Sequence, residues 1–368
     1  MQSYRSTTAA IALITAAAAA PASAELKYEN GRGGSVTVYG QLNPGYLSFD
    51  DGVSTTRELV DNAHSPSRVG LLLLQDYDAG TFSFNFETAL GLRSSDGFDQ
   101  TFTPGGADWS RTDLRRLDFA FASRTWGKIS VGQGSMATDG VAESDLSGTG
   151  LTNFVGVGNA AGSFQFRTAA GALSGIKIND VMPNLDSSRR GRIRYDTPEF
   201  SGFTFSVAAG EDVLTPNNDD KYYDAALRYA REFDGFDLVA AVGFSRRDRN
   251  GVDRDDTFGS VAVKLDSGLN FAFAAGSRKN DGDALYGKIG YDRKFWSIGE
   301  TSIAVDYYRG NDFNTVGSEA TSVGFGINQD IDSINTTVYL GYRSYEFTEV
   351  AQDYLDAESI LFGARWRF

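Results

Sequence analysis

Residues 201–207, Ser-Gly-Phe-Thr-Phe-Ser-Val, alternate strictly between apolar and small or polar side chains. Successive side chains of a strand point to opposite faces, so Phe203, Phe205 and Val207 share one face while Thr204 and Ser206 share the other. The first face suits lipid and the second suits a wet interior. The same pattern recurs at Leu269/Phe271/Phe273, Ile303/Val305/Tyr307, Val323/Phe325/Ile327 and Val338/Leu340/Tyr342. One such strand fits any β-sandwich, but so long a series is typical of a transmembrane β-barrel.

The alternation divides the chain into sixteen expected strands. An even number lets an antiparallel barrel close with both termini on one side. Turn sequences such as Asp234-Gly235 favour tight hairpins between neighbouring strands. The expected ranges are 35–47, 65–76, 80–92, 111–123, 127–135, 190–198, 202–211, 221–233, 236–247, 255–266, 268–278, 284–294, 300–310, 318–330, 334–345 and 356–368.

One connection, residues 136–189, is far longer than the others. A loop of this length is usually functional. We therefore expect an all-β fold, a sixteen-stranded antiparallel transmembrane β-barrel whose long third loop folds into the lumen.

The first 24 residues have the features of a secretory signal peptide. A positive charge at Arg5 is followed by an alanine-rich apolar stretch over 9–20 and by the small residues Ala22-Ser-Ala24. We expect cleavage after Ala24, so that residues 25–368 form the exported barrel. No later apolar run reaches the length of about 18 residues that a transmembrane helix needs, so any membrane span must be made of strands.

Composition narrows the class of partner and the source of stability. Removing Arg5 takes the formal charge from −14 to −15, which argues against a nucleic-acid partner because phosphate binding needs clustered Lys and Arg. There is no cysteine, so an exported chain of this size needs another source of stability than disulfides. The closed hydrogen-bond network of a barrel provides one.

Five segments, met in order along the chain, resemble the general diffusion porins of Gram-negative bacteria. These are Val36–Gln41, Ser67–Gly70, Gly127–Gln133, Arg194–Gly202 and the terminal Gly363–Phe368. The resemblance implies a homotrimer in the outer membrane of a Gram-negative bacterium, surrounded by lipid and lipopolysaccharide. It implies a water-filled channel for passive diffusion of small hydrophilic solutes and ions. It also implies that the terminal Phe368 is read by the outer-membrane assembly machinery.

In that family, arginines on the wall face acids on the inward loop. By strand and position, the wall arginines correspond to Arg68, Arg116 and Arg194. The apolar neighbours Val69, Leu117 and Ile193 point outward, which places these arginines inside. Arg192 shares the parity of Arg194, whereas Arg111 and Arg115 near the outer strand end are weaker candidates. Structural pairing of the arginines with Asp118 and Asp196 is the alternative.

The opposing acids are expected at Asp139, Glu143 and Asp145 of the long loop, with Asp180 and Asp186 behind them. An ordinary solvated loop is the alternative for each of these acids. Gln41 stands on the wall where many relatives carry a basic residue. The acidic chain, the loop acids and Gln41 together predict a weak preference for cations.

Three further possibilities remain. Asp253, Asp255 and Asp256 offer oxygen ligands for a structural Ca²⁺, although their spacing favours solvated turns, and no other cofactor is expected. An outer-membrane hydrolase is disfavoured because the one histidine, His64, is expected to be solvated in the first external loop and no Gly-x-Ser-x-Gly occurs. A substrate-selective channel stays open, since Tyr286, Tyr308 and Tyr339 have inward parity.

Overall fold

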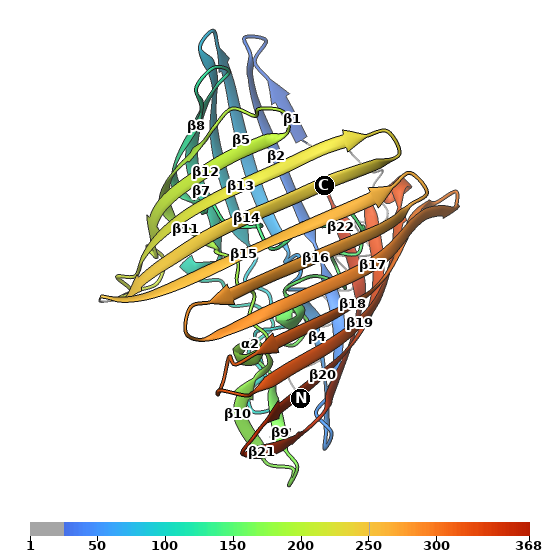
Figure 1. Cartoon of the computed structure of the whole chain (residues 1–368). Coiled ribbons are helices and arrows are strands. Elements are labelled where there is room, and N and C mark those ends of the chain that lie inside the picture. Colours follow the sequence, from blue (N-terminus) through green and yellow to red (C-terminus); the bar gives the residue numbers. More distant parts are fainter. Residues whose placement is uncertain (1–25, 250) are drawn as a thin grey trace.

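The computed structural model describes residues 26–249 and 251–368, and its strands form a closed antiparallel barrel (Figure 1). The predicted signal peptide lies outside the described residues. Two barrel strands are interrupted, the first being β2 (Gly34–Leu42) with β3 (Pro44–Asp50) and the second β4 (Thr55–Asp61) with β5 (Arg68–Tyr77). Counted this way, the described chain has the sixteen barrel strands that the sequence predicted.

The remaining barrel strands follow in chain order as hairpins. They are β6 (Gly80–Ala89), β7 (Leu114–Ser123), β8 (Gly127–Ser135), β11 (Arg189–Asp196), β12 (Phe203–Glu211), β13 (Lys221–Phe233), β14 (Phe236–Arg249), β15 (Val252–Leu265), β16 (Leu269–Arg278), β17 (Gly282–Trp296), β18 (Gly299–Asn311), β19 (Glu319–Ile331), β20 (Thr336–Glu349) and β22 (Ala357–Arg367).

The last strand closes the barrel against the first. β22 pairs with β20 on one side and with β3 and β2 on the other. The amide of Phe368 donates to the carbonyl of Gly40 (3.1 Å), and the amide of Gly40 donates back (2.9 Å). A Cβ on Gly40 would lie 2.6 Å from the Phe368 ring, so glycine is needed for this close approach. β1 (Leu26–Glu29) pairs with the part of β2 that precedes Gly40 and so extends the sheet past the side chain of Phe368.

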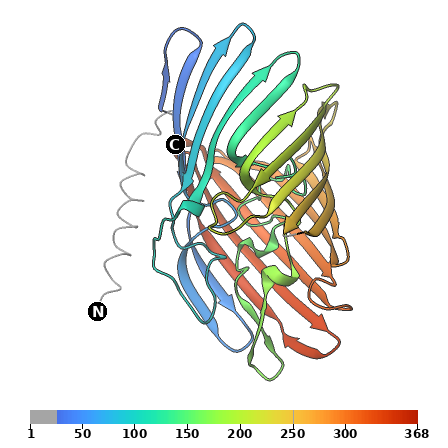
Figure 2. The ribbon, with the colours of Figure 1, turned by 90° about the vertical axis from the view of Figure 1, so that its left-hand side faces the viewer.

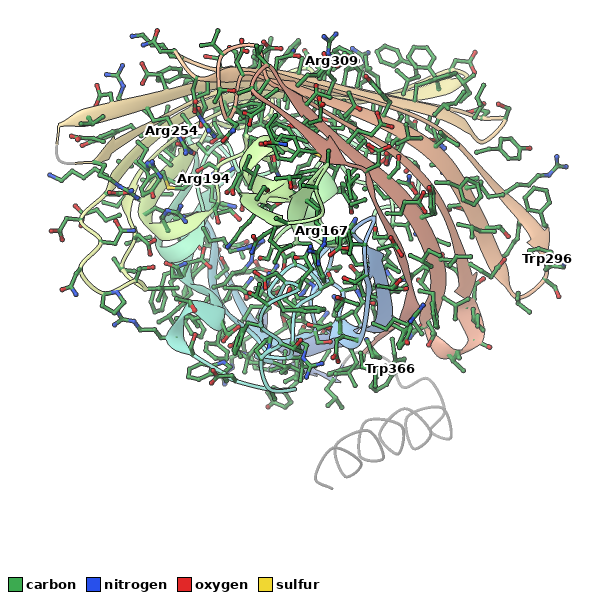
Figure 3. All side chains as sticks on the ribbon, turned by 90° about the horizontal axis from the view of Figure 1, so that it is seen from below. Arg167, Arg194, Arg254, Trp296, Arg309 and Trp366 are labelled. Atoms are coloured by element: carbon green, nitrogen blue, oxygen red, sulfur yellow. The ribbon has the colours of Figure 1, made fainter. Side chains whose placement is uncertain are left out.

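Alternation along each strand separates a lipid face from a lumenal face, as expected. In β18, Val305 and Tyr307 are 45% and 42% exposed, whereas Asp306 and Tyr308 are 2% and 1% exposed. Trp296 lies on the outside of the ring of strands and Arg167 lies within it (Figure 3). An apolar outer belt with a polar interior is the arrangement that a barrel needs in lipid.

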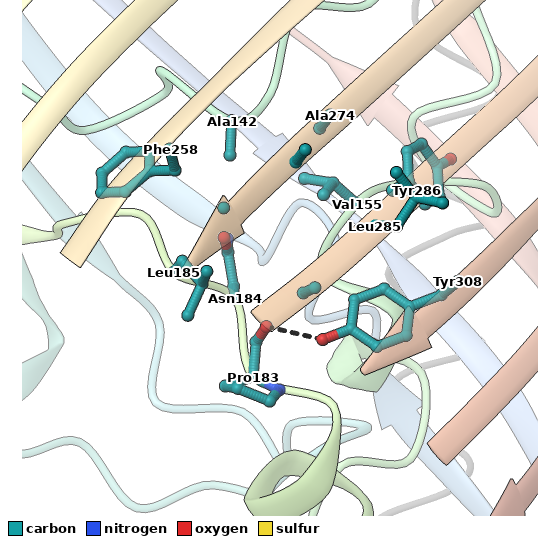
Figure 4. A pocket seen from close by; sticks show the side chains of 13 residues that line it. Ala142, Val155, Pro183, Asn184, Leu185, Phe258, Ala274, Leu285, Tyr286 and Tyr308 are labelled. Atoms are coloured by element: carbon teal, nitrogen blue, oxygen red, sulfur yellow. Dashed lines mark hydrogen bonds between the residues drawn. The ribbon is translucent and has the colours of Figure 1, made fainter. Parts of the chain in front are cut away.

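The loop over 136–188 folds into the lumen, as predicted (Figure 2). It carries the short strands β9 (Gln165–Thr168) and β10 (Leu173–Lys177) and the one-turn helix α2 (Ile178–Val181). Phe164 stacks on Phe49 of β3 with 4.1 Å between ring centroids. Tyr308 donates to the carbonyl of Pro183 at 3.1 Å, where the loop crosses the inner face of the wall (Figure 4).

One end of the loop joins the barrel rim through a small sheet. β9 pairs with β10 and with β21 (Gln352–Leu355), which in turn pairs with β20. The Arg167 Nε lies 2.8 Å from Oδ2 of the buried Asp51, next to this sheet. The loop is therefore held at its outer end as well as along the wall.

Two connections differ from the sequence prediction. Residues 55–61 are a strand rather than part of the first external loop, so that loop is only residues 51–54. β14 and β15 extend further than expected and leave only residues 250–251 between them. Among the described residues no helix is long and apolar enough to cross a membrane.

Candidate pore-lining site

The third loop fills one side of the lumen and leaves its polar edge toward the other side. Its apolar residues pack against side chains from β3, β4 and β16–β22 in one buried cluster, which includes Phe164, Val181 and Met182 of the loop. Two smaller clusters place Met136, Val141 and Leu185 of the loop against β12, β13 and β15. The remaining wall, β5–β8 with β11, carries most of the inward arginines described below. Any aqueous passage at this level therefore runs between that wall and the edge of the loop.

Glu87 of β6 gathers the first group of arginines. Arg115 Nε lies 2.5 Å from its Oε1, and Arg68 Nε lies 3.7 Å from its Oε2. The Tyr39 hydroxyl also donates to Glu87 at 3.0 Å. One carboxylate thus serves two guanidinium groups.

A β-bulge brings two consecutive arginines to this group. Glu87 is opposite Arg116, but the next pair along is Thr88 with Leu114, so β7 has one extra residue here. A bulge lets neighbouring side chains share a face that strict alternation would divide. Arg115, the weaker candidate from sequence, therefore contacts Glu87 while Arg116 keeps its inward register.

Two arginines near the loop edge have no ion pair. Within the described part of the chain, neither Arg116 nor Arg189 has a carboxylate oxygen within 4.0 Å. Arg189 is the first residue of β11, immediately after the loop. The charges of Arg115, Arg116, Asp139 and Glu87 are close enough to act on it electrostatically. Sequence reasoning missed Arg189, although its position at the end of the long loop could have suggested it.

Arg192 and Arg194, the two other predicted wall arginines, form ion pairs with aspartates. Arg192 is 6% exposed, and its Nη2 donates to Asp118 at 2.7 Å. Arg194 donates from Nε and Nη2 to Asp196 Oδ1 at 2.9 and 2.7 Å. Arg194 is thus paired with Asp196 of its own strand, as the structural alternative from the sequence proposed. Asp118 is paired instead with Arg192 on another strand, and not with Arg116 of its own strand.

Gln41 is buried, and its side chain supports the break in the second barrel strand. Its Nε2 donates to the carbonyls of Ser65 and Pro66 at 2.7 and 3.0 Å. This amide therefore shapes residues 62–67, which turn inward between β4 and β5.

His64, in the same segment, was expected to be solvated, and this was wrong. Both of its ring nitrogens are buried, and its ring centroid is 6.4 Å from that of Phe154 on the loop. Its neighbours are a packed phenyl ring and buried charges, because the segment lies under the third loop rather than outside the barrel.

The inward tyrosines are engaged by the protein. The Tyr286 hydroxyl donates to Asp306 at 3.1 Å, and that of Tyr308 donates to the loop, as noted above. Tyr339 is buried at the seam beside Gly45 and Gly363. None of these three rings forms a stacked platform along a passage.

The three predicted loop acids have different partners. Asp145 Oδ2 is 2.7 Å from Nζ of Lys288, whose side chain is 1% exposed. Asp139 lies near Arg228, whose Nη2 donates to the Asp139 carbonyl at 3.0 Å. Glu143 accepts from Asn184 at 3.2 Å and lies near Asp186. Asp180 accepts from the Lys177 amide of its own helix cap.

Burial raises the pKa of Glu143 to about 7, and the negative charge of Asp139 adds to the effect. Burial likewise raises the pKa of Asp186, with the neighbouring Glu143 as the next cause. Taking a carboxylate out of water and placing it near another disfavours its ionised form. The edge of the loop is therefore less negative near neutral pH than its three carboxyl groups suggest.

The external aspartates are neutralised by arginines. Asp255 receives Nε and Nη2 of Arg246 at 2.7 and 2.8 Å, and Asp256 receives Arg278 at 3.0 Å. Asp253 lies 3.4 Å from Arg246. The described residues contain no group of three or more His, Cys, Asp or Glu side chains placed to hold a metal ion.

A polar hollow of about 350 Å³ lies beside the arginine wall. Arg115, Arg189 and Arg190 line it together with Asp61 and Asp212. The Arg190 guanidinium stacks over Tyr222 at 4.3 Å from the ring centroid. The wall thus presents guanidinium groups to solvent-accessible space.

A family model described as Gram-negative porin matches residues 7–349. The chain belongs to the Gram-negative porin family. This porin is therefore an outer-membrane channel protein. No curated protein sequence matches it.

Solved structures of outer-membrane proteins share its fold at low sequence identity. An anion-selective porin from Comamonas acidovorans is 16% identical, with 91% of this chain and 100% of that chain covered and a TM-score of 0.61. OmpT of Vibrio cholerae in its trimer form is 16% identical, with 91% and 99% covered and a TM-score of 0.56. OmpF of Salmonella typhi in complex with daunomycin is 14% identical, with 93% and 100% covered and a TM-score of 0.58.

Proposed function

We propose that this porin is a non-enzymatic diffusion channel that passes small hydrophilic solutes and prefers anions. The observation that carries the proposal is the excess of positive charge where the loop edge faces the wall. Arg68, Arg115, Arg116 and Arg189 lie there, with Glu87, Asp61 and Asp139 as neighbouring acids, and Glu143 is only partly ionised near neutral pH. Rings of fixed charge bias ion passage without a tight binding site.

The weak cation preference expected from the sequence stays untested, but this arrangement does not favour it. The expectation rested on net charge and on Gln41. Acids such as Asp253, at the external end of β15, and Asp281, in an external turn, are exposed and lie away from the passage. Charges farther apart than about 8 Å are largely screened at physiological ionic strength. Gln41 is hydrogen-bonded to backbone and adds no charge either way.

The proposal includes the setting of the channel. We expect export by cleavage of residues 1–24, recognition of the C-terminal strand by the outer-membrane assembly machinery, and contact with lipid and lipopolysaccharide. A homotrimer is supported by the trimer form of the Vibrio OmpT structure. A substrate-selective channel is less well supported, because the inward tyrosine hydroxyls contact the protein.

Planar-bilayer recording combined with liposome swelling tests this function. We expect stepwise single-channel conductance that rises linearly with KCl concentration and swelling rates that fall smoothly with the size of neutral sugars. Conductance that saturates at low salt, or swelling with one sugar alone, would indicate a selective binding channel instead.

A further inference from the structure

A carboxyl pair holds together the turn where the third loop enters the lumen. The Asp186 carboxylate accepts the amides of Gly140 at 2.9 Å and Ala142 at 2.7 Å. Glu143, one residue beyond that segment, accepts from the side-chain amide of Asn184, and the side-chain oxygen of Asn184 accepts from the Asp186 amide. Two stretches of the loop, 139–143 and 184–186, are thereby joined at their acidic side chains.

The pair lacks the ion pairs that other lumenal acids have. Asp118, Asp145, Asp196 and Asp306 each have a Lys or Arg nitrogen at 2.7 or 2.8 Å. In the described chain, Glu143 and Asp186 have no cationic nitrogen within 4.0 Å, although Arg189 of β11 acts on Glu143 and Arg228 of β13 is near Asp186. Asp139 of the same turn is the third charged group facing them.

Two neighbouring carboxyl groups that have no cation beside them repel each other when both are ionised, so one of them keeps a proton. The two amides that point at Asp186 stabilise its ionised form, so the proton belongs mainly on Glu143. Adjacent carboxyl groups release their protons as a coupled unit rather than independently. We infer that Glu143 and Asp186 form a proton-sharing pair whose proton sets how strongly the pore prefers anions.

The inference rests on the proposed channel function and adds its regulation. At pH values below that at which the pair loses its proton, the loop edge keeps the proton and the arginine wall dominates the local electric field. Above it, the loop edge gains one negative charge opposite Arg189 and partly cancels that field. The raised pKa of Glu143, about 7, places the change near neutral pH. Anion preference is therefore present at low pH and declines as the pH rises.

The test measures the reversal potential of the full-length mature porin in planar bilayers under a KCl gradient, from pH 5.5 to 8.5. For wild type we expect the chloride-to-potassium permeability ratio to fall about two-fold across this range, since one charge in a wet, salt-screened pore has a modest effect. Glu143→Gln keeps the shape of the protonated side chain and should hold the ratio at its low-pH value throughout.

Two further variants separate the pair from its surroundings. Asp186→Asn removes the neighbouring charge, so Glu143 should titrate at lower pH and the midpoint should move down. Asp180→Asn changes another acid of the same loop, whose hydrogen bond within the described chain is to the Lys177 amide, and should follow wild type. A ratio that does not vary with pH in wild type, or that varies equally in Glu143→Gln, overturns the inference. Cation preference at pH 5.5 would instead contradict the proposed function, and the slope with pH would still report on the pair.

Discussion

At the scale of the residue, the lumenal carboxylates differ in what neutralises them. Asp306 lies deepest, with its side chain fully buried, and it accepts from Arg343, Tyr286 and Asn153. Arg343 is 3% exposed on its side chain and lies 2.8 Å from Asp306. Because Asn153 belongs to the third loop, this pair also fixes the loop to β18 and β20.

Arg343→Met should destabilise the folded barrel strongly, because it leaves the Asp306 charge buried without its cation. Breaking a buried pair by removing one partner costs roughly 3–5 kcal/mol. The measurement is the free energy of unfolding in detergent and urea. Lys294→Ala is the matched control, since Lys294 and Asp332 are 60% and 58% exposed and such a pair contributes about 0.2–1 kcal/mol. Equal effects of the two substitutions would show that burial does not matter here.

At the scale of the element, the closing strand carries the assembly prediction. Phe368 bonds Gly40 in both directions through the backbone, and its ring lies 4.9 Å from that of Trp366. Deleting Phe368 should lower the yield of folded protein in the outer membrane, read as heat-modifiable mobility on gels. Phe295→Ala removes a half-exposed aromatic of β17 away from the terminus and should leave the yield unchanged. Normal assembly without Phe368 would contradict a signal function.

Sequence alternation located the strands wherever one face of the strand contacts lipid and the other contacts the polar lumen. It located β12 to β20 closely, because lipid demands apolar side chains on one face. It failed at β4, where the outward residues are Thr55, Arg57 and Leu59, so no apolar alternation marks the strand. The same cause explains the longer ends of β14 and β15, whose terminal residues are mostly charged.

The candidate site was less predictable because its details depend on pairing across strands. Parity identified Arg68 and Arg116, but the bulge in β7 that turns Arg115 toward Glu87 has no signal in a strict period of two. Which arginines are neutralised is set by acids on neighbouring strands, as Arg192 with Asp118 shows. The proton-sharing pair joins residues 43 positions apart within the loop, so its two members become neighbours only after folding.

At the scale of the whole molecule, the third loop fills one part of the lumen and leaves the rest beside an arginine-rich wall. The loop packs its aromatic and aliphatic residues mainly against β3, β4 and β16–β22, and smaller groups of them against β12, β13 and β15, which fixes its position. The passage is left beside the arginines, and the sign of its field follows from which groups there stay charged. This division predicts ion preference from a few side chains rather than from the net charge of the chain.

The most direct test of that claim is the reversal potential of wild-type porin under a ten-fold KCl gradient at pH 6. We expect a chloride preference that decreases in Arg116→Ser and in Arg189→Ser, which each replace a wall arginine that has no ion pair within the described part of the chain. Arg249→Ser changes an exposed arginine bound to Asp220 and should leave the potential unchanged. A potassium preference in wild type, or a chloride preference that neither Arg116→Ser nor Arg189→Ser reduces, would contradict the account.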